Sequence, residues 1–174
     1  FIDGARMGSA ITSSENDLKL SDLVNLCDAF YIGGTKNGAL FGEALVICNE
    51  SLKKDFRYNI KQKGALLAKG RLLGIQFMEL FKDNLFFDLA KHANEMATLL
   101  QDALIEENYK LLIKSPTNQI FPIMPNSHIK KLREKYSFNT WEEYDEDHTI
   151  IRLVTSWATE KERVLEFIED LKSL

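Results

Sequence analysis

The stretch FYIGGTKNGALFGEALVI, residues 30–47, places a single lysine among glycines, a threonine and an asparagine, between two apolar runs. The runs, 30–32 and 44–47, have the length and composition of short buried strands. Lysine side chains are almost never buried and normally lie among other charges on a solvated surface. Lys36 is therefore the first candidate functional residue of the chain.

Two interpretations of Lys36 follow from its surroundings. An amine attacks a carbonyl carbon only when it is neutral, and enclosure by apolar strands and neighbouring cations favours the neutral form. The small residues beside Lys36 would also leave room for a planar cofactor against the backbone. The alternative is that Lys36 lies at the tip of an ordinary hairpin with GG and NG turns. Taken alone, the stretch favours the hairpin.

A second candidate, Asp3, lies in the opening segment FIDGAR. Phe1 and Ile2 resemble the end of a strand, and ligands of open α/β sheets bind beyond the carboxyl ends of strands. An enzyme that uses pyridoxal phosphate needs an aspartate on the pyridine nitrogen and, further along the chain, a lysine that forms an imine. The alternative is that DGAR forms a turn in which Arg6 pairs with a nearby acid.

The first two thirds of the chain are expected to be mainly helical outside these two segments. Capping residues followed by spaced leucines predict a short helix within 14–27, and charged and apolar residues at helical spacing predict another over 50–63. Residues 66–107 keep the helical pattern almost throughout. We expect a break within 82–88, with Asp83 or Asn84 capping the helix that follows.

After Ser115–Pro116 the pattern changes to that of a small α/β unit. We expect strands at 118–125, 137–144 and 149–157, a helix at 127–136 opened by Ser127, and a terminal helix capped by Thr159. This order predicts a sheet with helices on one side. The domain boundary is placed near 90–100, which gives domains 1–95 and 96–174.

Arg152 is the third candidate, in the predicted strand TIIRLVTSW. Strand periodicity puts Ile150, Arg152 and Val154 on one face, and both faces are otherwise largely apolar, so we expect a central, buried strand. A buried guanidinium needs an anionic partner. The partner is either a structural acid on the neighbouring strand, such as Glu142 or Glu143, or the carboxylate of a ligand.

Composition excludes several classes of protein. The net charge is −4 and no long basic run is present, which argues against a nucleic-acid surface. No apolar run approaches the roughly 18 residues of a membrane span. The two cysteines and three histidines have no metal-ligand spacing, so we expect no metal and a reduced, cytoplasmic protein. Trp141 and Trp157 are expected in the core. Because the chain begins with FIDGAR and not with Met, we read it as the C-terminal part of a longer protein.

Three segments together resemble the threonine aldolase and β-eliminating lyase group of pyridoxal phosphate enzymes: FIDGARMGSA, YIGGTKNGALFGEALVI and IIRLVTSWAT. The helical block IKQKGALLAKGRLLGIQF extends the resemblance. It implies a fold-type I α/β architecture: part of a large, mostly parallel sheet domain that binds the cofactor, plus a small C-terminal α/β domain. The implied activity is cleavage of L-threonine or L-allo-threonine to glycine and acetaldehyde. The alternatives are a β-eliminating amino-acid lyase on the same cofactor or a non-catalytic fragment.

The resemblance also implies residue roles. Lys36 matches the lysine that forms the Schiff base, Asp3 matches the partner of the pyridine nitrogen, and Arg6 matches the arginine near the 3-hydroxyl of the cofactor. Thr35 stands where related aldolases commonly carry serine, and Arg152 matches the arginine that holds the substrate carboxylate. The phosphate loop and the residue stacked over the ring would lie in the absent half, so we expect the 174 residues alone to be inactive.

Self-association as a homodimer or homotetramer is also implied by the resemblance. A basic residue that reaches the phosphate of the neighbouring subunit is expected close to Gly64. The candidates are Arg57, Lys61 and Lys63.

Overall fold

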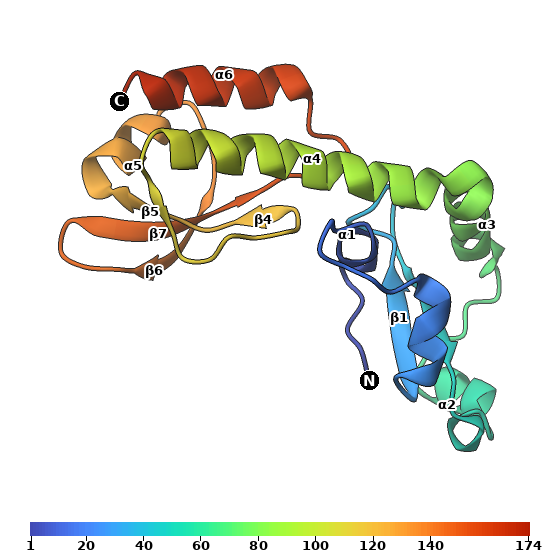
Figure 1. Ribbon diagram of the computed structural model, residues 1–174. Coiled ribbons are helices and arrows are strands. Elements are labelled where there is room, and N and C mark those ends of the chain that lie inside the picture. The colour runs from blue at the N-terminus through green and yellow to red at the C-terminus, as the bar shows by residue number, and fades with distance from the viewer. The chain divides into compact units, whose positions relative to one another are not determined.

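The computed structural model describes residues 1–174 and divides them into two compact units, Phe1–Ala90 and Lys91–Leu174 (Figure 1). The boundary falls inside the longest helix, α4 (Leu85–Glu106). Assignment of the units to a cofactor-binding domain and a small C-terminal domain stays a prediction. None of the helices combines the length and the apolar composition that crossing a lipid bilayer requires.

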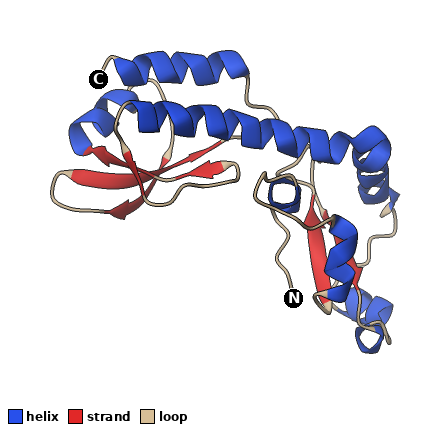
Figure 2. Ribbon diagram, in the orientation of Figure 1, coloured by secondary structure: helices blue, strands red, loops and turns tan.

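The first unit joins one pair of strands to short helices (Figure 2). Its strands are β1 (Ala29–Gly33) and β2 (Glu43–Ile47). Its α-helices before α4 are α1 (Met7–Ile11), α2 (Phe56–Gln62) and α3 (Arg71–Phe81), and its 3-10 helices are η1 (Leu20–Asn25), η2 (Glu50–Leu52) and η3 (Lys82–Asn84). The helix expected within 14–27 is therefore a 3-10 helix, and residues 66–70 precede the helix that was expected to include them.

β1 and β2 form an antiparallel hairpin, in register from Ala29↔Ile47 to Gly33↔Glu43. Ile2 adds a parallel bridge to Phe30 on the other side of β1. β1 is buried as predicted, with Phe30 and Ile32 in the core cluster of this unit. The expectation that β2 is buried is wrong. No residue of β2 is fully buried, and Leu45 is 46% exposed because nothing in this chain covers its side chain.

The predicted break before α4 is confirmed. Asp83 and Asn84 have φ values of 51° and 64°, in the left-handed region that an α-helix cannot contain. Asparagine and aspartate tolerate this region better than other residues with a Cβ atom, which explains why α3 ends here. After the break, Phe86 is fully buried at the start of α4.

The second unit contains a five-stranded sheet whose pairings are all antiparallel. The strands are β3 (Lys110–Leu111), β4 (Gln119–Ile120), β5 (Pro122–Pro125), β6 (Asn139–Glu143) and β7 (His148–Val154). β4 and β5 pair with β7 in one continuous register, from Gln119↔Val154 to Pro125↔His148. They therefore act as the single strand predicted over 118–125. β6 pairs with the other side of β7, which makes β7 central, as predicted.

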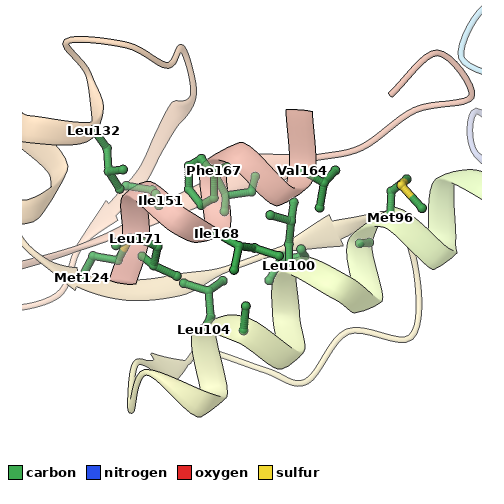
Figure 3. Close-up of a cluster of buried hydrophobic side chains, with 14 of the residues drawn as sticks. Met96, Leu100, Leu104, Met124, Leu132, Ile151, Val164, Phe167, Ile168 and Leu171 are labelled. Atoms are coloured by element: carbon green, nitrogen blue, oxygen red, sulfur yellow. The ribbon is translucent and has the colours of Figure 1, made fainter. Parts of the chain in front are cut away.

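Helices gather on one face of this sheet, as the sequence predicts (Figure 1). They are α4, α5 (Asn126–Leu132) and α6 (Lys161–Lys172). Figure 3 shows how Leu100 and Leu104 of α4 meet Ile151 of β7 and Ile168 of α6 in one apolar cluster. The predicted helix caps are wrong, because α5 begins one residue before Ser127 and Glu160 holds the N-cap position of α6.

Two neighbouring residues of α4 test the importance of this core. Leu104 is fully buried, whereas Ile105 is 46% exposed. We predict that Leu104→Ala lowers the free energy of unfolding by about 2–5 kcal/mol, the range for cavities left in a core. Ile105→Ala leaves no closed cavity and should lower the free energy of unfolding by well under half that amount. Urea denaturation of the full-length protein measures both, and equal losses would show that the contacts of Leu104 do not form the core.

Candidate functional site

A backbone contact between the segment that carries Asp3 and the end of β1 brings Asp3 and Lys36 to the same part of the first unit. The Gly33 N–H, at the end of β1, donates a hydrogen bond to the Gly4 carbonyl over 2.9 Å. One step earlier, the Ile2 N–H donates to the Ala29 carbonyl over 3.1 Å. The segment that carries Asp3 therefore runs beside β1, and Lys36 follows three residues after the last of these contacts.

Glycine is required on both sides of this contact. A Cβ atom on Gly4 would lie 1.6 Å from the carbonyl oxygen of Tyr31, and one on Gly33 would lie 2.7 Å from the carbonyl oxygen of Ala5. Both atoms struck belong to the backbone and cannot rotate away. The two segments can approach this closely only because neither carries a side chain at the point of contact.

The turn that carries Lys36 is fixed to the start of α4 by Asn37. This side chain is buried, and its Nδ2 donates to the Phe86 carbonyl over 2.7 Å. The Asn37 N–H closes the turn by donating to the Gly34 carbonyl over 2.8 Å. Lys36 does connect the strands of a hairpin, as the simpler interpretation held, but this turn is a fixed one held by a buried amide.

Lys36 and Thr35 both project from this turn into solvent in this chain. The apolar enclosure that the sequence suggested for Lys36 is not found, because β2 on one side is itself half exposed. No ion pair in the structure involves Lys36. Its amine is therefore accessible and is not engaged by an acid.

Asp3 is exposed and ionised, and two hydrogen bonds fix its carboxylate. The Tyr31 hydroxyl and the Ala5 N–H, the latter at 3.0 Å, both donate to Oδ1. The hydrogen bond from Tyr31 lowers the pKa of Asp3 most, and the Ala5 N–H and the charge of Lys36 lower it further. Conversely, the hydrogen bond to Asp3 raises the pKa of Tyr31 to about 12. Oδ2 has no hydrogen-bond partner within the chain and remains available as an acceptor.

Arg6 lies in the same loop, three residues after Asp3. It is half buried and immediately precedes α1, with its carbonyl accepting the Ala10 N–H over 3.1 Å. The contact between Gly4 and Gly33 thus brings four of the five predicted site residues into two adjoining segments: Asp3, Arg6, Thr35 and Lys36.

Arg152, the fifth predicted residue, lies on β7 in the second unit. No ion pair involves it, so the proposed structural pairing with Glu142 or Glu143 is wrong. Its guanidinium lies 5.6 Å from the ring centre of Trp141, at the bulge of β6, and its Nε is buried without a hydrogen-bond partner. An unpartnered buried donor is costly and rare in native proteins, which fits a group that receives its partner when a ligand binds.

Arg152 also lines a cleft of about 460 Å³ in this unit. Two other cations line it, Lys135 and Arg163, and each lies 2.8 Å from a carboxylate oxygen of Glu166. Arg152 is the cation of this cleft that has no acid of its own. The prediction that both tryptophans belong to the core is wrong, because Trp141 and Trp157 are 51% and 43% exposed.

Comparison with solved structures of low sequence identity identifies the fold class of the chain. The chain matches an 8-amino-7-oxononanoate synthase from Francisella tularensis at 15% identity and TM-score 0.56, over 83% of this chain and 44% of that one. A lysine aminotransferase from M. tuberculosis matches at 10% identity and TM-score 0.53, over 98% and 40%. At such identities only the fold is shared. It is the α/β fold of the fold-type I enzymes, as predicted.

The more similar relatives are threonine aldolases. A threonine aldolase structure from Leishmania major is 50% identical, with TM-score 0.96, over 98% of this chain and 50% of that one. Curated enzymes named low specificity L-threonine aldolase, from Pseudomonas sp. and Pseudomonas aeruginosa, are each 32% identical over 99% and 98% of this chain. No family model matches. The chain is homologous to threonine aldolases along nearly its whole length, and it spans about half the length of the curated relatives it matches.

Sequence reasoning missed two residues of the site, Tyr31 and Asn37. Alternation along β1 sets Tyr31 on the face opposite Phe30 and Ile32, which is readable from the sequence. That this face adjoins Asp3 depends on the parallel bridge between Ile2 and Phe30, which no local pattern predicts. For Asn37, the NG pair suggested a turn residue, while its hydrogen bond to Phe86 spans 49 positions.

The contact between Gly4 and Gly33 can be tested by adding one methyl group. We predict that Gly4→Ala prevents native folding of the first unit or strongly lowers its melting temperature, because the Cβ atom would overlap the backbone of β1. Gly74→Ala is the matched control: this glycine lies inside α3 with nothing within 4 Å of an added Cβ. It should stabilise the helix by about 0.5–1 kcal/mol. Thermal unfolding of the full-length variants measures both, and a Gly4→Ala protein as stable as wild type would contradict the contact.

Proposed function

We propose that the full-length protein is a pyridoxal phosphate-dependent aldolase that cleaves L-threonine or L-allo-threonine to glycine and acetaldehyde. One observation carries the proposal: a chain homologous to enzymes named L-threonine aldolase carries Asp3 and Lys36 on two segments that the contact between Gly4 and Gly33 joins. Neither residue alone would distinguish this function from an ordinary turn.

The residues present fit the cofactor. Oδ2 of Asp3 is an unoccupied acceptor on a carboxylate that stays ionised, as the pyridine nitrogen would require. The amine of Lys36 is accessible and lies close enough for its charge to act on Asp3. In this proposal Lys36 holds the cofactor covalently, Asp3 accepts the hydrogen bond of the ring nitrogen, and Arg6 and Thr35 contact the cofactor.

When bound, pyridoxal phosphate supplies the electron sink that allows the Cα–Cβ bond of a β-hydroxy amino acid to break. The task of the chain is then to orient the substrate. Arg152 would hold the substrate carboxylate by two parallel hydrogen bonds, which a guanidinium makes and an ammonium cannot reproduce. Its unpartnered Nε is the feature of the structure that supports this role.

The products identify the reaction. Full-length protein incubated with pyridoxal phosphate and L-threonine should release glycine and acetaldehyde in equal amounts. Ammonia and a keto acid in their place would establish the alternative, a β-eliminating lyase on the same cofactor. Neither set of products, despite bound cofactor, would contradict both activities.

Further parts of the proposal concern the whole protein. We propose self-association as a homodimer or homotetramer, supported by the exposure of Leu72, Ile75 and Met78 along α3. We also expect the 174 residues alone to be inactive, because they span about half of the relatives' length. A cytoplasmic location is consistent with two free cysteines.

Arg152 gives a test of substrate binding that is separate from cofactor binding. We predict that Arg152→Lys weakens amino-acid binding by on the order of 1.5–3 kcal/mol, the range for a hydrogen bond to a charged group. Cofactor content and melting temperature should barely change. Calorimetric titration of the loaded enzyme with L-threonine or glycine measures the loss.

Arg133→Lys is the matched control for this change. Arg133 also lies 5.6 Å from an aromatic ring centre, that of Phe138, but its guanidinium already donates to the Thr140 hydroxyl over 2.6 Å. Arg133→Lys should therefore leave substrate affinity unchanged. If Arg152→Lys unfolds the second unit while the surviving enzyme keeps its affinity, Arg152 is structural and the proposed role is wrong.

A further inference from the structure

Tyr31 is the residue near the proposed site that no role yet accounts for. It lies on β1 between the buried residues Phe30 and Ile32, and its own ring points to the opposite face. Because Ile2 bridges Phe30 in parallel register, Asp3 and Tyr31 are the next neighbours along the two segments and share that face. The Tyr31 hydroxyl reaches across and donates to Asp3.

Both hydrogen bonds to Asp3 end on the same carboxylate oxygen, which leaves the other oxygen for a ligand. Tyr31 and the Ala5 N–H both donate to Oδ1, and Oδ2 accepts from neither. Two donors on one oxygen hold the plane of the carboxylate and so fix the direction in which its other oxygen points. The bond from the Ala5 N–H is a local turn contact two residues along the chain, whereas the bond from Tyr31 comes from β1 and ties the carboxylate to the sheet.

We propose that Tyr31 is a positioning residue for Asp3: its hydroxyl fixes Oδ1 so that Oδ2 is presented, ionised, to the nitrogen of a bound pyridinium ring. This inference rests on the proposed function and goes beyond it by assigning a role to a residue that acts through Asp3.

The chemical reason concerns the proton shared by Asp3 and the ring nitrogen. A hydrogen bond to the carboxylate stabilises its charged form and makes it a weaker base. The shared proton then stays on the nitrogen and does not move to the carboxylate, so the ring keeps its positive charge. The nearby charges are Lys36, which also favours the ionised carboxylate, and Glu43, which acts on Tyr31. Neither residue takes part in the hydrogen bond between Tyr31 and Asp3.

The test compares Tyr31→Phe with Tyr144→Phe in the full-length protein. Tyr31→Phe keeps the ring and its contact with Phe1 at 6.1 Å but removes the donor. Tyr144 is exposed and lies in the second unit, so its hydroxyl serves as the control. In the cofactor-free protein, carbon NMR of labelled aspartate should show the pKa of Asp3 raised toward its ordinary value in Tyr31→Phe alone.

With the cofactor bound, nitrogen NMR of the labelled pyridine ring should show a smaller protonated fraction in Tyr31→Phe than in wild type. Turnover should fall about tenfold, the effect of one hydrogen bond of ordinary strength, with KM nearly unchanged. Asp3→Asn, which removes the carboxylate itself, should lower both the protonated fraction of the ring and the turnover further.

The outcomes separate the two proposals. A wild-type protein that cleaves threonine, with Tyr31→Phe indistinguishable from Tyr144→Phe in ring protonation, overturns the role of Tyr31 alone. A wild-type protein that binds no pyridoxal phosphate overturns the proposed function and the role of Tyr31 with it. In that second case the aspartate titration still reports whether the hydrogen bond exists.

Discussion

The backbone contact between Gly4 and Gly33 is the interaction on which the candidate site depends. It sets the loop after Ile2 against the end of β1, so that Asp3 and Lys36 lie on adjoining segments. A Cβ atom at either glycine would overlap a carbonyl oxygen of the opposite segment. The proposed site therefore requires glycine at both positions, because only then can the two segments approach each other. The surrounding polar groups fix individual side chains within that arrangement.

The polar contacts divide into those that hold the site and those left open for a ligand. Asn37 holds the lysine turn to α4, and Tyr31 holds one oxygen of Asp3. The groups without a partner within the chain are Oδ2 of Asp3, the amine of Lys36 and, in the second unit, the buried Nε of Arg152. An acceptor, an amine and a cation without an acid are the groups that a cofactor with a basic nitrogen and an aldehyde, and a substrate with a carboxylate, would require.

Local sequence patterns predicted much of this structure. The break at Asp83 and Asn84, the central position of β7 and the helices on one face of its sheet all follow from periodicity and capping preferences. The errors occurred where burial depends on distant segments. β2 has the composition of a buried strand but none of its residues is fully buried in this chain, and Trp141 is half exposed at a β-bulge. Likewise, Asp3 and Lys36 could be named from the sequence, whereas Tyr31 and Asn37 became visible only through tertiary contacts.

The most direct measurement is the identity of the residue that holds the cofactor. Full-length protein loaded with pyridoxal phosphate is reduced with borohydride, digested and analysed by mass spectrometry, which locates the modified lysine among all lysines of the chain. We predict a single modified peptide that contains Lys36, since its amine is accessible and free of ion pairs and its turn follows the strand end that adjoins the Asp3 loop. A cofactor adduct on any other lysine, with Lys36 unmodified, would contradict the site described here.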